Sequence, residues 1–475
     1  MPNGNALSEL RELLGPKGFS DDRDAMAPWL TDWRGRYTGS AAALVSPANT
    51  AEVAAVVRIA AKYRLAIVPQ GGNSGMVAGA TPDSSGEQVI LSLRRMNAIE
   101  AIDPDSGLVR CEAGVILQNL HEATAAKGRR FPLTLGGKGS ATIGGLISTN
   151  AGGTQVLRHG TMRLLVAGVE AVLPDGSVYD GMAPLKKDNR GYDLKHLLIG
   201  GEGTIGIVTR AVLTTVPALI DRCVIWAGVD SPLQAYRLLL FMQARARERL
   251  EGFEILPQRA LGAVVKHISG TRPPLDTPHR WHALMEIVQD DPNQSAPAEL
   301  AAKLLEEAIG AGLLENATIA ASETQADAFW KIRDSVAEAE RAEGPALQHD
   351  ISVPVPYMAE FIETESPVIE ARWPGTAIVA FGHLGDGNIH FHVKAPKHIA
   401  AADWYAGDGK AITAHVYDCV RNYAGSLSAE HGIGQAKIDE FARLAEPARL
   451  AALRAIKQAF DPLGIMNPGK LVPLA

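Results

Sequence analysis

The chain has 475 residues, of which 46% are hydrophobic and 21% are charged, which predicts two or three folded domains of roughly 150 residues each. Its 53 acidic and 46 basic residues give a formal net charge of −7 without a basic tract, which argues against a nucleic-acid partner. The cysteines Cys111, Cys223 and Cys419 are widely spaced, and no apolar run approaches the roughly 20 residues that span a bilayer. We therefore expect a cytoplasmic protein without disulfides, a thiolate zinc site, a signal peptide or a membrane span.

The first half of the sequence alternates helices with short strands. Asn49 and Glu52 have capping-box spacing and predict a helix over residues 49–65. The runs LAIVPQGG, VILSLRRM and LVRCEAGV predict strands broken by glycine, and LQNLHEATAAKG predicts a helix that ends at Gly128. Farther along, VAGVEAVLP and SVYDG predict two strands joined by a turn at residues 174–176.

Two glycine-rich segments follow in this half. PQGGNSGMVAG, residues 69–79, has four glycines after an apolar strand, and glycine lets the backbone turn several N–H groups toward one point. Alone, this segment is as typical of an ordinary loop as of a phosphate-binding one. GGKGSATIGGLISTNAGG, residues 136–153, repeats the pattern and adds polar donors, namely Ser140, Thr142, Ser148, Thr149 and Asn150. Two such segments predict a site for a long, phosphorylated ligand.

A third glycine pattern matches a nicotinamide site, but its context contradicts that ligand. Gly201, Gly203 and Gly206 fit the G-x-G-x-x-G pattern, and Asp221 lies 20 residues after Gly201. The pattern requires a following helix whose N-terminus faces the pyrophosphate, whereas IVTRAVLTTV is rich in β-branched residues and predicts a strand. We therefore expect no nicotinamide-binding Rossmann domain.

After Ala218 the sequence changes to longer helices, and we place a domain boundary there. SETQADAFWKIRDSVAEAERAEG predicts one helix, opened by Ser322 and Gln325 in capping-box spacing. The last predicted helix ends at Pro462 and Gly464, before an irregular tail.

The second half also carries a group of histidines. IVAFGHLGDGNIHFHV predicts two strands around a glycine turn, with His390 and His392 on one strand face and His383 folding back toward them. Glu430 and His431 follow about 40 residues later, in front of two glycines. Each histidine alone is more typical of a polar loop residue, but histidines together with a carboxylate favour zinc, manganese or iron.

Six sequence motifs together resemble those of one enzyme family. They are, in chain order, PQGGNSGMVAG, LGGKGSATIGGLISTNAGG, KKDNRGYDLKHLLIGGEGTIGIVT, HLGDGNIH, AEHGIG and NPGK. From about Trp33 to Val472 the chain resembles the FAD-dependent D-2-hydroxyglutarate and D-lactate dehydrogenase family of the vanillyl-alcohol oxidase superfamily. The resemblance implies an α+β fold with a two-part PCMH-type FAD-binding domain (1–218, core about 38–217), an α/β cap domain with the metal site (219–458), and a C-terminal segment (459–475) that returns to the FAD domain.

The resemblance also implies which residues hold FAD. Relatives with covalent FAD attach the flavin through a histidine in the first glycine loop, where this chain has Asn73, so we expect non-covalent FAD. The expected FAD-binding residues are Gln70, Gly71, Gly72, Asn73, Ser74, Gly75, Met76, Leu135, Gly136, Gly139, Ser140, Thr142, Gly144, Gly145, Ser148, Asn150, Gly152, Glu202, Gly203, Ile207 and Asn467.

The resemblance assigns further roles outside the glycine segments. His383, His390 and Glu430 match the ligands of a divalent metal, which we expect to be zinc, with manganese or iron as alternatives, and His431 matches a catalytic base. Arg333 in WKIRDSVAEAE matches an arginine that binds the substrate carboxylate. These parts suit oxidation of a D-2-hydroxy acid to the 2-oxo acid, in which the hydroxyl loses its proton while the Cα hydride moves to flavin N5.

Three positions differ from the hydroxyglutarate-using relatives. Those relatives have Thr or Ser one turn after the arginine, Lys before the D-h-S-h-P stretch, and Asn two residues after the second metal histidine, where this chain has Ala337, Gln348 and His392. Loss of the lysine leaves a distal carboxylate less well paired, so the reaction class is predicted and the particular acid stays open. We expect Gln348 and His392 to contact substrate, and Asp386 and Asn388 to brace the hairpin turn.

Two other functions remain open from the sequence. A flavin oxidase of the same fold, acting on a sugar, lactone or aryl alcohol, would not require the histidine and glutamate set. A non-catalytic flavoprotein subunit would not require His431. No iron–sulfur cysteine pattern is present, so we expect an external electron acceptor, either an electron-transfer flavoprotein or a quinone. We also expect a homodimer.

Overall fold

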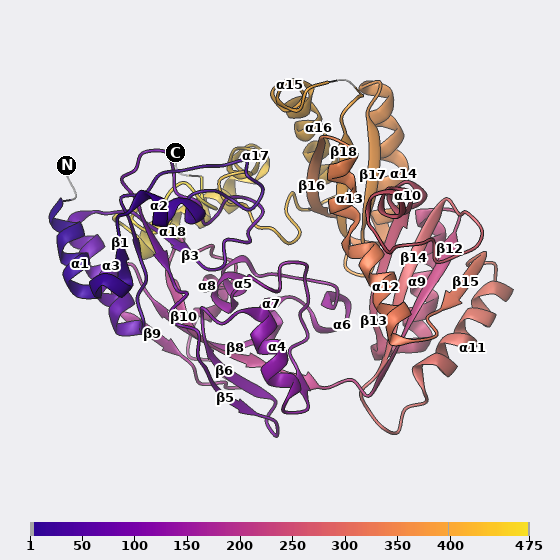
Figure 1. Cartoon of the computed structure of the whole chain (residues 1–475), viewed down its shortest axis with the longest axis horizontal. Coiled ribbons are helices and arrows are strands. Elements are labelled where there is room, and N and C mark those ends of the chain that lie inside the picture. The colour runs from indigo at the N-terminus through magenta and orange to yellow at the C-terminus, as the bar shows by residue number, and fades with distance from the viewer. Residues whose placement is uncertain (1–3, 398, 474–475) are drawn as a thin grey trace. The chain divides into compact units, whose positions relative to one another are not determined.

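The computed structural model describes residues 4–397 and 399–473 (Figure 1). The chain forms two compact units. The first unit contains the described residues up to Gly153, residues 159–218 and the residues from Glu430 onward; the second contains residues 154–158 and 219–429. Both units combine helices with sheets, so the predicted α+β class is confirmed.

The first unit is built on two larger sheets. One has the strand order β1-β2-β4-β3, in which β2, β4 and β3 are parallel, and the other is antiparallel with the order β5-β6-β10-β8-β9. β7 and β11 pair separately. The strands are β1 (Phe19–Ser20), β2 (Ala43–Val45), β3 (Ile67–Gln70), β4 (Val89–Ser92), β5 (Ile99–Asp103), β6 (Leu108–Glu112), β7 (Arg129–Arg130), β8 (Val166–Val172), β9 (Val178–Gly181), β10 (Ile207–Thr214) and β11 (Val216–Pro217). The helices are α1 (Gly4–Gly18), α2 (Arg23–Met26), η1 (Ala27–Trp29), α3 (Thr50–Tyr63), α4 (Leu117–Ala125), α5 (Ile143–Thr149), α7 (Met162–Leu165), α8 (Lys195–Leu198), α17 (Ile438–Leu444) and α18 (Pro447–Phe460), and α6 (Val156–His159) joins the two units.

Local sequence signals account for several of these elements. Asn49 caps α3, because its side chain accepts from the amide of Glu52 at 2.9 Å while the Glu52 carboxylate accepts from the amide of Ala48 at 2.7 Å. β8 and β9 pair across the predicted turn. The segment after GEGTIG forms strand β10 and not a helix, which confirms the exclusion of a nicotinamide-type Rossmann motif.

The C-terminal residues return to the first unit. Ile67 of β3 exchanges backbone hydrogen bonds of 2.8 Å with residues 465 and 467, which adds a parallel bridge at the sheet edge. Ile456 and Phe460 of α18 pack against the apolar core of the same unit. The return therefore begins at Glu430, earlier than the expected residue 459, because α18 shares this core.

Lys457 of α18 is a buried cation. Its Nζ donates to Asp461 Oδ2 at 2.5 Å and to the carbonyl oxygens of Thr204 and Met466 at 2.7 Å. Burial lowers its pKa, and the partnership with Asp461 opposes that effect. Removing one member of a buried ion pair leaves the other uncompensated, so Lys457→Met should lower the free energy of unfolding by about 3–5 kcal/mol, measured by urea unfolding.

An exposed ion pair in the same unit provides the control for this prediction. Lys62 Nζ lies 2.7 Å from Glu9 Oε1, and the Lys62 side chain is 59% exposed. Lys62→Met should therefore change the urea midpoint little. If both variants lose the same free energy of unfolding, the burial of the Lys457 ion pair does not stabilise the protein as predicted.

The described residues of the second unit form one sheet of seven strands. Its order is β15-β12-β14-β13-β17-β18-β16, and every neighbouring pair is antiparallel. The strands are β12 (Asp221–Val229), β13 (Leu250–Pro257), β14 (Trp281–Gln289), β15 (Asn316–Ile319), β16 (Ala346–Ser352), β17 (Ala377–His383) and β18 (Asn388–Lys394). The helices are α9 (Pro232–Ala246), η2 (Arg247–Arg249), α10 (Gln258–His267), α11 (Pro297–Gly310), α12 (Glu323–Asp334), α13 (Val336–Ala342), α14 (Val355–Arg372), α15 (Ala401–Ala406) and α16 (Asp408–Asn422).

The helix predicted from Ser322 is interrupted. Ser322 caps α12 by accepting from the amide of Gln325 at 3.3 Å, as its spacing predicts. The prediction of one continuous helix was wrong, because Ser335 adopts φ −87° and ψ −1° and separates α12 from α13. Serine competes for local backbone hydrogen bonds and is a weak residue inside helices. Within residues 4–397 and 399–473, no helix has both the length and the apolar character needed to cross a bilayer.

Candidate functional site

The two glycine-rich segments lie against each other in the first unit. A Cβ on Gly71 would lie 2.2 Å from Thr142 Oγ1, and a Cβ on Gly72 would lie 1.7 Å from the carbonyl oxygen of Ser140. No side chain has room at either contact, so glycine is required where the first segment crosses the second. The segments predicted to share one ligand therefore form one structural element.

Several predicted polar groups of the second segment already have partners within the protein. The hydroxyls of Ser140 and Thr149 donate to backbone carbonyls of the same segment. Thr142 caps α5 by accepting from the amide of Gly145 at 3.4 Å. Asn150 ends α5 with φ +50°, and its Oδ1 accepts from the Thr161 hydroxyl and from the Arg163 amide, both at 3.0 Å. These side chains shape the segment.

Glu202 connects a loop of the first unit to the segment that follows His431. Its buried carboxylate accepts from the amides of Ile433 at 2.7 Å and Gly434 at 2.8 Å, and burial raises its pKa. Asn467 joins the same network, because its Nδ2 donates to the carbonyl oxygen of Glu202 at 2.8 Å. The Glu202 side chain holds the backbone beside the predicted base, and its expected contact with FAD stays a prediction.

Two buried acceptors in the first unit have no hydrogen-bond partner among the described residues. They are Gln70 Oε1 and Asn467 Oδ1, whose amide nitrogens donate to backbone carbonyls. Buried acceptors in native proteins nearly always have a partner, and those without a protein partner accept from a ligand or water. All the residues predicted to hold FAD belong to this unit, mostly in the loops after β3, around α5 and before β10.

The histidine hairpin forms in the second unit as predicted. β17 and β18 pair antiparallel, and the ring centroids of His383 and His390 lie 5.7 Å apart. His390 and His392 share a strand face, with ring centroids 6.3 Å apart. Burial lowers the pKa of His390 well below its usual range, and the charge of Arg333 lowers it further. Both effects favour the neutral imidazole, which is the form that binds metals.

Glu254 is a residue that the sequence analysis missed. It is 1% exposed on β13, accepts from Arg333 Nε at 2.6 Å and bonds to Nδ1 of His383. Burial alone would raise its pKa, but Arg333 and His383 outweigh burial and lower the pKa to about 2. An acidic residue inside the apolar run LEGFEILP was the signal that could have identified it.

His392 and Gln348, two of the positions that differ from the relatives, lie together. They are directly opposed across β16 and β18. His392 Nδ1 bonds to the carboxylate of Glu340, which is 2% exposed on α13, the helix that also carries Ala337. Glu340 was likewise not predicted. This part of the unit is thus lined by a histidine and an acid, without the lysine of the relatives.

The hairpin turn is braced as the sequence predicted. Asp386 Oδ1 accepts from the amide of Asn388 at 3.0 Å, and Asn388 Nδ2 donates to Asp350 Oδ1 and to the carbonyl oxygen of Ile351 at 3.0 Å. The amide of Ala429 donates to the carbonyl oxygen of Asp350 at 3.4 Å. Glu430 and His431 follow Ala429 directly in the chain and are the first residues of the returning part of the first unit.

A second group of possible metal ligands in the second unit has another explanation. Ligand atoms of Glu365, His415 and Cys419 lie within 4.8 Å of one another. Burial and the hydrogen bond to Glu365 raise the pKa of the Cys419 thiol to about 12, so the sulfur keeps its proton and donates it. Arg372 Nη1 lies 3.3 Å from His415 Nδ1, which places a cation beside the group. These contacts indicate a hydrogen-bonded thiol.

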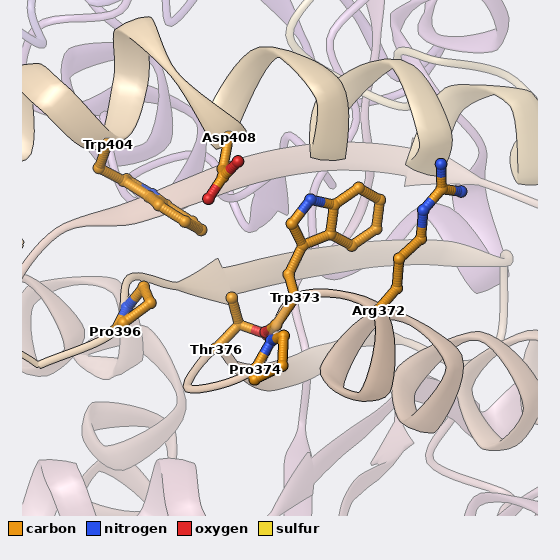
Figure 2. Close-up of a pocket in the computed structure, with 7 residues that line it drawn as sticks. All are labelled: Arg372, Trp373, Pro374, Thr376, Pro396, Trp404 and Asp408. Atoms are coloured by element: carbon orange, nitrogen blue, oxygen red, sulfur yellow. The ribbon is translucent and has the colours of Figure 1, made fainter.

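Figure 2 shows a pocket of about 360 Å³ in the second unit. It is lined by Arg372, Trp373, Pro374, Thr376, Pro396, Trp404 and Asp408. The guanidinium of Arg372 stacks on Trp373, with Cζ 4.6 Å from the ring centroid. None of the residues predicted for catalysis, metal binding or substrate binding lines this pocket.

Two family models match the chain. The model described as "FAD binding domain" matches residues 41–181, and the model described as "FAD linked oxidases, C-terminal domain" matches residues 221–471. Solved structures share the fold. p-Cresol methylhydroxylase has a TM-score of 0.75 at 16% identity and covers 99% of this chain and 96% of its own. An alkyldihydroxyacetonephosphate synthase has a TM-score of 0.72 at 17% identity, covering 98% and 84%. The predicted fold is therefore confirmed.

Several relatives are similar over nearly the whole chain. The mitochondrial D-2-hydroxyglutarate dehydrogenase of Arabidopsis thaliana is 36% identical over 468 residues, which cover 98% of this chain and 81% of the relative. D-2-hydroxyglutarate dehydrogenase of Xanthomonas citri pv. viticola is 34% identical over 443 residues, covering 93% and 91%. A putative mitochondrial D-lactate dehydrogenase of Schizosaccharomyces pombe is 32% identical over 450 residues, covering 93% and 84%.

Proposed function

Because the chain belongs to the family of FAD-linked D-2-hydroxyglutarate dehydrogenases that its motifs resemble, we propose that it oxidises a D-2-hydroxy acid to the 2-oxo acid. One observation carries this proposal: Arg333, His383 and His390 lie in one cluster of the second unit, in which Arg333 and His383 are buried. An arginine suits a carboxylate, and neutral imidazoles suit a divalent metal. A 2-hydroxy acid offers both a carboxylate and a hydroxyl to such a cluster.

The first unit is the proposed FAD site. Its glycine segments cross with no room for a side chain at Gly71 or Gly72, and glycine-rich backbone of this kind suits a pyrophosphate. The unpaired acceptors Gln70 Oε1 and Asn467 Oδ1 suit donors of the same ligand. Asn73 replaces the histidine of covalent relatives, and its Nδ2 donates to the carbonyl oxygen of Thr31, so FAD is held without a covalent bond. FAD in this unit would accept the hydride from Cα.

His383, His390 and Glu430 are the proposed ligands of a divalent metal. The donor set fits, because Nδ1 of His383 is engaged by Glu254 and burial favours the neutral form of His390. Two imidazoles with a carboxylate favour zinc, manganese or iron over calcium. Such a metal would acidify the substrate hydroxyl, and His431, the next residue after Glu430, would take the proton.

The substrate contacts proposed for the second unit are Arg333, Gln348 and His392. Arg333 pairs with the α-carboxylate. Gln348 and His392 face the rest of the substrate, where Glu340 adds a negative charge. D-2-Hydroxyglutarate and D-lactate are the first candidates, and without the lysine the second carboxylate of hydroxyglutarate is less well paired.

Anaerobic reduction of the flavin tests this function. Loss of the oxidised-flavin absorption band should follow addition of one D-2-hydroxy acid and not of its L-form, with D-2-hydroxyglutarate, D-lactate and D-malate as the panel. A chelator should abolish this reduction, and added zinc or manganese should restore it. If the chelator leaves the rate of flavin reduction unchanged, the reaction does not require a metal. Reduction by sugars, lactones or aryl alcohols alone would favour the oxidase alternative, and no reduction by any of these would favour a non-catalytic subunit.

Electron transfer and location extend the same proposal. The reduced flavin would pass its electrons to an external carrier, either an electron-transfer flavoprotein or a quinone, and we propose a homodimer. The three cysteines are free and buried, which supports a reducing compartment such as the cytoplasm. The plant and yeast relatives named above are mitochondrial by name, so fractionation of the source cells would decide between the two compartments.

A further inference from the structure

Glu254 contacts two of the proposed site residues at once. One carboxylate oxygen accepts from Arg333 Nε at 2.6 Å, and the other bonds to Nδ1 of His383. Glu254 and His383 are directly opposed on β13 and β17, so the sheet itself fixes this pairing. The side chains of Glu254, Arg333 and His383 are 1%, 9% and 9% exposed. The contact is therefore a desolvated network inside the second unit.

The bond to Glu254 determines where His383 carries its proton. A carboxylate that pairs with Arg333 through one oxygen accepts a hydrogen bond through the other. Nδ1 of His383 must then carry hydrogen, so the neutral ring presents its lone pair at Nε2. Metal-binding histidines are generally fixed in this way by a carboxylate on the other ring nitrogen.

The same carboxylate also orients Arg333. With Nε held by Glu254, the guanidinium carbon lies 5.3 Å from the Phe381 ring centroid, and Nη2 lies 3.4 Å from Nε2 of His383. The Nη end of the arginine is thus directed to the atom through which His383 would bind a metal. A substrate carboxylate at Arg333 would lie beside that metal.

We propose that Glu254 is a positioning residue that holds His383 in the metal-binding tautomer and holds Arg333 next to it. This inference rests on the proposed function, since it presumes that His383 is a metal ligand. It adds that metal affinity and substrate affinity depend on one buried carboxylate. Glu254 itself touches neither the metal nor the substrate.

Replacement of Glu254 by glutamine separates this role from simple packing. Glutamine keeps the shape, but its NH2 group donates, so it cannot accept both from Arg333 Nε through one terminal atom and from Nδ1–H of His383 through the other. In the full-length, flavin-loaded protein, Glu254→Gln should weaken zinc binding about 10–100-fold in a competition titration against a chelator. At saturating zinc, KM for the hydroxy acid should rise more than kcat falls, because Arg333 loses its anchor. Glu254→Asp, which keeps the charge, should restore part of the zinc affinity.

Glu251 offers a matched control on the same strand. It is 3% exposed, and its carboxylate accepts at 3.0 Å from Nη1 of Arg158, a residue with no proposed role in the site. Glu251→Gln should lower the melting temperature without changing zinc affinity. Equal zinc affinities for wild type and Glu254→Gln, or equal weakening in both glutamine variants, would overturn the positioning role.

The tautomer of His383 can also be measured directly in the wild-type protein, so the test does not depend on whether the Glu254→Gln variant folds. Nitrogen-15 NMR of the metal-free wild-type protein, with the His383 signals assigned from a His383→Gln variant, should show hydrogen on Nδ1. Hydrogen on Nε2 would overturn the inference while leaving the proposed function intact. A wild-type protein that binds no divalent metal at all would overturn the metal part of the proposed function and this inference with it.

Discussion

Replacing His431 with asparagine should lower the rate of anaerobic flavin reduction by about 10²–10⁴-fold. A positioned proton acceptor contributes rate enhancement of this size, and asparagine keeps a similar polar shape without accepting a proton near neutral pH. The backbone after residue 431 should stay in place, because Glu202 holds the amides of Ile433 and Gly434. Flavin content and zinc content should therefore equal those of the wild type. Stopped-flow absorbance at saturating substrate isolates the chemical step.

The pH dependence sharpens this prediction. The wild-type rate should fall at low pH as the base becomes protonated, and the variant should lose that dependence. His267→Asn is the control, because His267 bonds to Glu343 on the surface of the second unit and has no proposed role. A rate within about tenfold of the wild type for His431→Asn would assign proton removal to another group.

Short-range patterns predicted most of the architecture. The capping residues Asn49 and Ser322 begin helices where their spacing requires, since a cap depends on a few consecutive residues. The alternation around GHLGDGNIH fixes a hairpin, and the hairpin brings His383 and His390 together without any longer-range information. The same reasoning excluded a nicotinamide site, because β-branched residues after Gly206 form β10.

Short-range patterns could not predict which residues pair with the buried acidic side chains. Glu254 lies 129 residues from His383 and 79 from Arg333 in sequence. The pairing of β13 with β17 brings it to His383, and Arg333 reaches it from helix α12. Sequence periodicity marks such a residue as buried but does not identify its partner. The same holds for Glu340 and His392, which are 52 residues apart. Glu202 is a further example, because its motif predicted a ligand contact and did not indicate that the side chain holds the amides of Ile433 and Gly434.

The crossing of the glycine segments gives the second large expected effect, in Gly72→Ala. The added Cβ would lie 1.7 Å from the carbonyl oxygen and 2.6 Å from the carbonyl carbon of Ser140. Both atoms belong to the backbone, so the two segments must separate to admit a methyl group. Overpacking of this kind costs about 1–3 kcal/mol of stability, and the cradle proposed for the pyrophosphate opens. Gly72→Ala should purify with little or no flavin, measured as the ratio of flavin to protein absorbance.

Gly75→Ala provides the control, because it tests whether a methyl group blocks the flavin directly without pushing the two glycine segments apart. Apart from its chain neighbours, no described atom lies within 4 Å of a Cβ added at Gly75, so the methyl group should leave the stability of the flavin-free protein unchanged. If Gly75→Ala nevertheless binds flavin less tightly, the space beside Gly75 belongs to the ligand. Full flavin content in Gly72→Ala would contradict the proposal that the crossed segments hold FAD, because the backbone contact on which that proposal depends would then be dispensable.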